Sequence, residues 1–302
     1  MNQTMEKLNQ IGMIPVVKLE DISKALPLAR ALTAGGIPAA EVTFRASGAE
    51  KVIAQLRESF PDMVVGAGTV LNIRQAVQAI DAGALYIVSP GLNPEIVSFC
   101  QEKNIPVIPG CATPTELERA VSLGVNVVKF FPAEQNGGLA GIKALCGPYD
   151  GVRFIPTGGV NLRNLSDYLS HPRIFACGGT FMAPPELIEK NDWDGIAALC
   201  RSAVDETLGI TPCGSLSLLL EQLIGVTPAS EDQTPCDHYE KEVSCLQITV
   251  NSLPRACYWL KQKGIEVLDP ALEEDAGVSH ASVLIKGVPP FSIRLIQKQR
   301  GA

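Results

Sequence analysis

Along the first 180 residues, short apolar runs alternate with segments whose apolar positions recur at helical spacing. The segments 72–82 and 114–123 are examples, and each opens on a polar residue or a proline, as helices commonly do. The apolar runs number eight, and they begin near Met13, Ala39, Met63, Ala84, Ile105, Asn126, Arg153 and Ile174. Strands that alternate with helices are typically parallel. The pattern therefore predicts an α/β fold, a (β/α)8 TIM barrel.

The pattern changes after residue 210. Helical segments from Pro185 and from Trp193 would complete the barrel, and Thr211-Pro212-Cys213-Gly214 then reads as a break. Beyond it we expect an apolar helix, a polar loop, a strand from Cys245, a helix over 254–264 and two or three strands that end near residue 298. The sequence thus predicts a barrel over residues 1–210 and a small α+β module, βαβββ-like, over residues 213–302.

Composition agrees with a globular protein of two domains. The chain has 302 residues, of which 46% are hydrophobic and 19% charged. The net charge is −7 without a basic stripe, so we expect no nucleic-acid partner. The nine cysteines include no C-x-x-C pair, which argues against a disulfide framework or a zinc ribbon. No signal peptide or apolar stretch of about 18 residues is present, so we expect a cytoplasmic protein without membrane contact.

The second predicted strand carries charge. Glu41, Thr43 and Arg45 alternate along it and therefore share one face, whereas Val42 and Phe44 share the other. If the apolar side chains face the helices, Glu41 and Arg45 point into the barrel, whose active sites lie at the carboxyl ends of the strands. A Glu41–Arg45 ion pair with no further role is an equally good interpretation of these residues alone.

The sixth predicted strand contains the strongest chemical signal, Lys129. The same alternation turns Lys129 and Phe131 to one side of the strand and Val128 and Phe130 to the other. Apolar surroundings and a nearby cation such as Arg45 would favour the free amine, which can attack a carbonyl group and form a Schiff base. The alternative is a lysine that only extends its charge from the strand end into solvent.

Glycines follow several strands, at Gly66 and Gly68, at Gly91, at Gly158 and Gly159, and at Gly178 and Gly179. Glycine lets backbone N–H groups approach an anion closely, although turns require glycine as well. The loops after strands seven and eight hold phosphate in many TIM barrels. The two glycine pairs in these loops therefore indicate a phosphate site.

Seven motifs together resemble the KDPG/KHG aldolase family, in order, over residues 5–208. They are Glu41-Val-Thr-x-Arg45, Gly66-Ala-Gly-Thr69, Ser89-Pro-Gly91, Pro109-Gly110, Val128-Lys-Phe-Phe-Pro-Ala-Glu134, Pro156-Thr-Gly-Gly-Val160 and Gly178-Gly179. The family comprises class I aldolases that act on 2-dehydro-3-deoxy-6-phosphogluconate, its galactonate epimer or 4-hydroxy-2-oxoglutarate. The resemblance leaves open which of these substrates the chain prefers.

The resemblance implies a role for each site residue. Lys129 would form the Schiff base, and Glu41 would be the general acid and base. The other positions would bind the substrate: Arg45 and Thr69 the carboxylate, Pro90 and Phe131 the apolar wall, Thr157 the sugar hydroxyls, and Gly158, Gly159, Gly179 and Thr180 the phosphate. Thr180 replaces a serine that is frequent in the family and keeps the hydroxyl. The resemblance implies no cofactor and no metal, and a homo-oligomer, with a trimer favoured.

The C-terminal module resembles one βαβββ half of the glyoxalase-like vicinal-oxygen-chelate fold. Cys245 and Arg294 stand where that fold holds metal ligands, and a cationic arginine cannot bind a divalent metal, so we expect no metal there. His238 and His280 are isolated histidines, and Tyr258 and Trp259 are expected to lie on a helix and to belong to the core or to an interface. A half module of this kind would pair with a second copy from another subunit.

Two other functions are compatible with a barrel of this type. An epimerase or phosphate-sugar isomerase would share the glycines of loops seven and eight but would use paired carboxylates or a metal. A barrel that only binds or regulates would not need a reactive lysine. Lys129 and the scarcity of histidines argue against the isomerase, and intact Lys129, Glu41 and Arg45 argue against the binding protein.

Overall fold

The computed structural model describes residues 2–208, 245–250, 252–262, 266–267, 280–284 and 292–297. Compactness divides the chain into two units, Met1–Arg201 and Ser202–Ala302. The predicted break at residues 211–214, the apolar helix after it and His238 lie outside the described residues. The boundary between residues 210 and 213 therefore stays a prediction.

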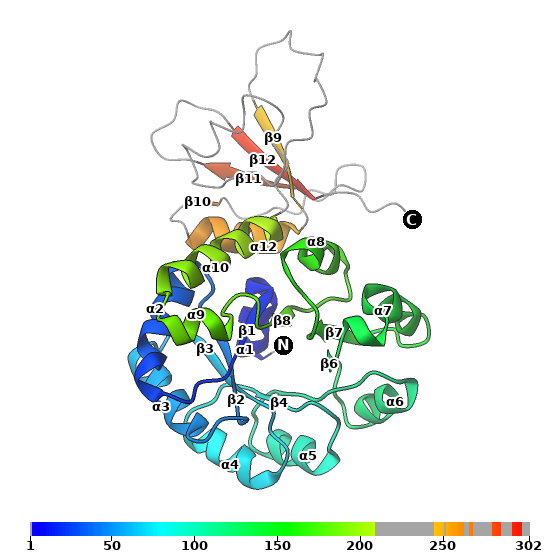
Figure 1. The fold of residues 1–302 in the computed structure, drawn as a ribbon. Coiled ribbons are helices and arrows are strands. Elements are labelled where there is room, and N and C mark those ends of the chain that lie inside the picture. Colours follow the sequence, from blue (N-terminus) through cyan, green and yellow to red (C-terminus); the bar gives the residue numbers. More distant parts are fainter. Residues whose placement is uncertain are drawn as a thin grey trace. The chain divides into compact units, whose positions relative to one another are not determined.

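The first unit is a curled, parallel α/β sheet with helices on its outer side (Figure 1). All eight predicted strands are present: β1 Met13–Val17, β2 Ala39–Thr43, β3 Val64–Gly68, β4 Ile87–Val88, β5 Val107–Ile108, β6 Val127–Phe130, β7 Arg153–Pro156 and β8 Cys177–Gly179. Six form one sheet in the order β5-β4-β3-β2-β1-β8, and β6 pairs with β7. Isolated bridges join Gly110 to Lys129, Phe154 to Ile174 and Thr157 to Gly178.

One helix precedes β1, and the others lie between the strands or after β8. They are α1 Gln3–Ile11, α2 Ala25–Ala34, α3 Ala49–Ser59, α4 Ile73–Asp81, α5 Pro94–Glu102, α6 Pro114–Ser122, α7 Gly138–Cys146, α8 Leu162–Ser170, α9 Pro185–Lys190 and α10 Trp193–Leu208, with short 3-10 helices η1 Ile22–Lys24 and η2 Glu134–Asn136. Figure 1 shows α2 to α8 around the outside of the sheet and α1 across the middle of the ring.

Side-chain caps fix where several helices begin. The Asn72 side chain accepts the Gln75 N–H at the start of α4, and Asn93 does the same for α5, whose first residue is Pro94. Thr113 and Glu116 form a capping box at the start of α6. These caps place the predicted helices 72–82 and 114–123 within one or two residues of their observed bounds.

One helix has no counterpart among the predicted elements. Asn2 caps α1, and Leu8 and Ile11 on this helix are fully buried. Most of its other positions are charged or polar. The sequence therefore does not show that one face of this helix is buried. Its packing beside β1 adds apolar core to one end of the sheet.

The second unit contains β9 Cys245–Val250, α12 Leu253–Gln262, β10 Glu266–Val267, β11 His280–Leu284 and β12 Ser292–Gln297. Its strands lie in the order β10-β11-β12-β9, with β9 parallel to β12 and the other pairs antiparallel. Trp259 on α12 is buried and packs edge-on against Tyr258, as expected for this helix. Among the described residues, no helix is both long and apolar enough to cross a membrane.

Candidate active site

Lys129 lies on β6, where the alternation predicted it. Val128 and Phe130 are fully buried, and Phe130 packs edge-on against Phe154 of β7. On the opposite side of the strand, the Lys129 Nζ atom lies 5.3 Å from the centre of the Phe131 ring. Lys129 is 5% exposed, so its amine is held away from bulk water inside the sheet.

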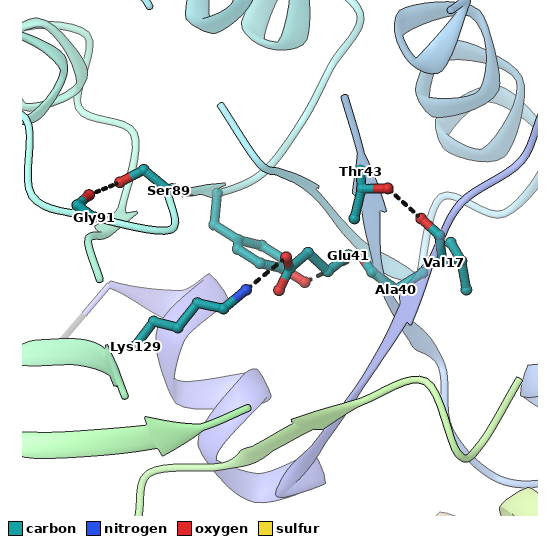
Figure 2. A network of polar contacts seen from close by, with 8 residues as sticks. Val17, Ala40, Glu41, Thr43, Ser89, Gly91 and Lys129 are labelled. Carbon is teal, nitrogen blue, oxygen red and sulfur yellow. Dashed lines mark hydrogen bonds and ion pairs between the residues drawn. The ribbon is translucent and has the colours of Figure 1, made fainter. Parts of the chain in front are cut away.

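Glu41 of β2 is the charged partner of this lysine. The Lys129 Nζ and Glu41 Oε1 atoms are 3.1 Å apart, and both side chains are buried (Figure 2). The ion pair of Glu41 is therefore with Lys129 and not with Arg45, which is exposed. A buried pair of this kind can exchange a proton without creating a net charge in the low-dielectric interior.

Thr43 and Tyr86 fix the strand that carries Glu41. The Thr43 hydroxyl donates to the Val17 carbonyl oxygen at 3.1 Å, which ties β2 to β1. The Tyr86 hydroxyl donates to the Ala40 carbonyl oxygen at 3.0 Å. Burial, with a smaller contribution from the charge of Glu41, raises the pKa of Tyr86 well above its usual value, so the phenol remains a donor. Both bonds hold the backbone on either side of Glu41.

Gly66 and Gly68 on β3 make room for these side chains. A Cβ atom at Gly68 would lie 2.2 Å from Glu41 Oε1, and one at Gly66 would lie 2.3 Å from the ring of Tyr86. Both glycines are needed because the side chains of Glu41, on β2, and Tyr86, just before β4, occupy the space beside β3. This packing gives the two glycines a purpose apart from anion binding.

Substitution of Gly66 by alanine is expected to destabilise the protein. Tyr86 is fully buried and hydrogen-bonded, so its ring cannot move away from the new methyl group without disturbing β2. We expect a loss of about 1–3 kcal/mol in the free energy of unfolding. Gly91→Ala is the matched control, because a Cβ atom there meets nothing within 4 Å. Equal urea midpoints for the two variants would show that the Tyr86 ring has room to shift.

The other residues predicted for the first loops are less buried than Lys129 and Glu41. Arg45 is exposed, Thr69 and Pro90 are half-buried, and Phe131 is 41% exposed, which is unusual for an aromatic ring. Thr69 has a φ of 55°, a left-handed conformation that is costly for a residue with a branched Cβ. Strain of this kind is common at binding sites.

The loops after β7 and β8 bring the other predicted residues together. The backbones of Thr157 and Gly178 pair in an isolated parallel β-bridge. A Cβ atom at Gly178 would lie 2.4 Å from Thr157 Oγ1. Gly158 and Gly159 both have positive φ values, 95° and 84°, which favour glycine. The Thr157 hydroxyl is buried and has no hydrogen-bond partner within the described part of the chain. A bound polar group would satisfy it.

Tyr86 and Ser89 support the site without having been predicted to do so. Tyr86 stands in the apolar run from Ala84, which served only to predict a strand. The Ser89 hydroxyl donates to the Gly91 carbonyl oxygen at 2.7 Å and so shapes the turn that presents Pro90 (Figure 2). Short side-chain-to-backbone bonds of this type are characteristic of serine before a turn.

Burial makes several of the described cysteines poor nucleophiles. Six of them are free thiols, and burial raises the pKa of Cys100 to about 11 and that of Cys200 to about 12. Burial and the nearby Glu116 carboxylate raise the pKa of Cys111 to about 12. In the described ranges, no group of three His, Cys, Asp or Glu residues is arranged to hold a metal ion. Among these groups, the buried amine of Lys129 is the best placed nucleophile.

Comparison with known proteins gives the family. Residues 4–199 match the model of the KDPG and KHG aldolase family. The chain belongs to this family. A 2-dehydro-3-deoxy-phosphogluconate aldolase of Treponema pallidum is 50% identical over 199 residues, which are 66% of this chain and 95% of that protein. An aldolase of the same name from Haemophilus influenzae is 45% identical over 203 residues, or 67% of this chain and 96% of its own.

A solved structure of the family has the same fold. It is the KDPG aldolase of Legionella pneumophila, crystallised with pyruvate captured at low pH as a covalent carbinolamine intermediate. The TM-score is 0.65 at 39% sequence identity, and the match covers 67% of this chain and 98% of that one. The family match ends at residue 199, so the C-terminal module lies outside it.

Proposed function

We propose that this family member is a class I aldolase that cleaves a 2-keto-3-deoxy sugar acid through a Schiff base on Lys129. The observation that carries the proposal is the buried contact of 3.1 Å between Lys129 Nζ and Glu41 Oε1. A nucleophile beside a proton acceptor is the arrangement that covalent catalysis on a carbonyl group requires. The carbinolamine captured in the Legionella pneumophila relative supports the same chemistry.

Formation of the imine uses both members of the pair. Lys129 Nζ gives a proton to Glu41 Oε1 and attacks the C2 carbonyl carbon of the substrate as a neutral amine, which yields a carbinolamine. The Glu41 carboxyl group then returns a proton to the C2 hydroxyl, directly or through a water, and water leaves. The product is a protonated imine between Lys129 and the substrate, beside a Glu41 carboxylate.

Cleavage follows from the positive charge of the imine. The Glu41 carboxylate removes the proton of the C4 hydroxyl through a water, the C3–C4 bond breaks, and its electron pair neutralises the imine nitrogen. An aldehyde departs and a pyruvate enamine remains on Lys129. The Glu41 carboxyl group then protonates C3, and hydrolysis of the imine releases pyruvate and the free amine. The residues of the chain supply every proton transfer, and we propose no cofactor.

Arg45 and Thr69 are proposed to hold the pyruvate carboxylate at the mouth of the site. An arginine can bind a carboxylate with two parallel hydrogen bonds, and the exposed position of Arg45 leaves its guanidinium accessible. Pro90 and Phe131 are proposed to cover the apolar methylene of the substrate. The exposed ring of Phe131 beside Lys129 supports this role.

The loops after β7 and β8 are proposed to bind the distal half of the substrate. Thr157 would contact a sugar hydroxyl, and its unpartnered buried hydroxyl supports this. A phosphate group would lie against the backbone of Gly158, Gly159, Gly179 and Thr180. The Gly159 N–H donates to no acceptor in the described part of the chain, so it is free to bind an anion.

The proposed main substrate is 2-dehydro-3-deoxy-6-phosphogluconate, which gives pyruvate and glyceraldehyde 3-phosphate. The names of the relatives at 45–50% identity support it. The family description also includes KHG, 4-hydroxy-2-oxoglutarate, whose cleavage gives pyruvate and glyoxylate. The galactonate epimer differs at one hydroxyl, and a comparison of kcat/KM for the three acids would rank them.

We also propose an architecture for the whole chain. The isolated bridges between β5 and β6 and between β7 and β8 support a closed (β/α)8 barrel. The order of the C-terminal elements supports a βαβββ half module, for which we propose pairing with a second copy. We also propose a homo-oligomer, with a trimer favoured, and a cytoplasmic location. Sedimentation of the full chain would test the assembly.

The decisive experiment traps the imine. Pyruvate and sodium borohydride are added to the wild type and to Lys129→Ala, and the products are read by intact and peptide mass spectrometry. We expect a reduced pyruvyl adduct on the peptide that contains Lys129, and none in the variant. An absent adduct in folded wild-type protein would remove Schiff-base catalysis and favour a barrel that only binds or regulates.

A further inference from the structure

Glu134 lies directly against the loop after β7. It follows β6 as the first residue of η2, and its N–H donates to the Gly158 carbonyl oxygen at 3.1 Å. A Cβ atom at Gly159 would lie 2.3 Å from Glu134 Cγ. The aliphatic part of the Glu134 side chain therefore covers the face of Gly159 and fixes how close the two loops can be.

The carboxylate of Glu134 is held by a tyrosine from a third element. The Tyr168 hydroxyl, on α8, donates to Glu134 Oε1, and Tyr168 is 1% exposed. Burial first, and then the hydrogen bond and charge of Glu134, raise the pKa of Tyr168. The phenol therefore stays protonated and remains a donor to the carboxylate.

The same helix also fixes the carbonyl side of Gly159. Asn161, the N-cap of α8, and Asn164, in its first turn, donate their side-chain amides to the Gly159 carbonyl oxygen at 2.9 and 3.2 Å. With its carbonyl oxygen bound from one side and Glu134 packed on the other, Gly159 has one orientation. Its N–H is left without an acceptor in the described ranges.

A carboxylate beside an anion site normally weakens anion binding, because like charges repel. In this protein, one oxygen of the Glu134 carboxylate accepts a hydrogen bond from Tyr168. This bond gives the acidic side chain a structural role in the loop. We propose that Glu134 and Tyr168 are positioning residues that hold the Gly158–Gly159 turn in the conformation that receives the phosphate group of the substrate. This role rests on the proposed aldolase function.

The test compares a phosphorylated with an unphosphorylated substrate. For Tyr168→Phe, we expect KM for 2-dehydro-3-deoxy-6-phosphogluconate to rise about tenfold, because a hydrogen bond to a charged group is lost. KM for 4-hydroxy-2-oxoglutarate is expected to change by less than about threefold, since that acid has no phosphate. Glu134→Ala loses both the bond and the contact with Gly159, so its effect on the phosphorylated substrate should be larger.

Two further variants separate positioning from general damage. Glu134→Gln keeps the packing and an acceptor for Tyr168. Unlike Glu134→Ala, it should therefore have a KM near the wild-type value. Tyr149→Phe is the matched control, because Tyr149 also donates to a glutamate, Glu118, and has no contact with the loop among the bonds of the described residues. It should leave both KM values unchanged.

The outcomes distinguish the positioning role from the aldolase activity. Equal changes of KM for both substrates in Tyr168→Phe, with pyruvate still trapped on Lys129, would overturn the positioning role and leave the aldolase. A raised KM in Glu134→Gln would also overturn the positioning role, because glutamine keeps both the packing against Gly159 and the acceptor for Tyr168. A wild type that forms no pyruvate adduct would overturn the aldolase and the positioning role together.

Discussion

Replacement of Lys129 by methionine is expected to lower kcat/KM for cleavage of 2-dehydro-3-deoxy-6-phosphogluconate by about 10⁴-fold or more. Methionine has a similar length but no amine, so no imine forms and the C3–C4 bond has no electron sink. The release of pyruvate, followed with a coupled lactate dehydrogenase assay, measures the loss. Lys51→Met removes an exposed lysine and should have wild-type kinetics.

The same variant also tests the buried ion pair. Without the lysine, the Glu41 carboxylate is buried without its cation, which we expect to cost about 3–5 kcal/mol in the free energy of unfolding. Lys129→Met/Glu41→Gln removes both charges and should recover most of that stability, while activity stays absent. Recovery of activity together with stability would contradict a nucleophilic role for Lys129.

Glu41→Gln is expected to lower kcat by about 10²–10⁴-fold, the usual contribution of a general acid or base. The amide oxygen can still accept a hydrogen bond from Lys129 Nζ, but it cannot take up the proton. Every proton transfer that we assign to the carboxylate should slow down. Pyruvate trapping with borohydride should still label Lys129, only more slowly.

An assay with pyruvate alone isolates the proton transfer at C3. Pyruvate alone should exchange its methyl protons for deuterium in D2O, because the imine and enamine interconvert through Glu41. We expect exchange, followed by NMR, to fall with kcat in Glu41→Gln and to be unchanged in Glu118→Gln, an exposed carboxylate. Unchanged exchange in Glu41→Gln would reduce Glu41 to an ion-pair partner.

Many elements of the fold were predictable because their signals are local. The strand β6 and the inward direction of Lys129 follow from alternation, which is a property of any extended chain. The start of α6 follows from Thr113, Pro114 and Glu116, which act within one turn. The strand ends were less accurate: β4 and β8 begin three residues later than the apolar runs from Ala84 and Ile174.

The partner of Glu41 was not predictable from the same signals. Alternation placed Glu41, Thr43 and Arg45 on one face, and an ion pair within the strand was as reasonable as one across the barrel. Lys129 lies 88 positions further along the chain. Whether their side chains meet depends on how far β2 and β6 are staggered around the ring, which no residue near either strand specifies.

The sequence by itself determined the order of the eight strands and of the helices between them, the inward-facing side chains of β2 and β6 and, through seven motifs, the family. Only the tertiary structure decided that Lys129 and Glu41 are 3.1 Å apart, that Gly66 and Gly68 make room for buried side chains, and that Tyr168 holds Glu134 against Gly159. Propensities, caps and alternation act over a few residues and can be read along the chain. Contacts across the sheet depend on register, curvature and packing, to which the whole unit contributes at once.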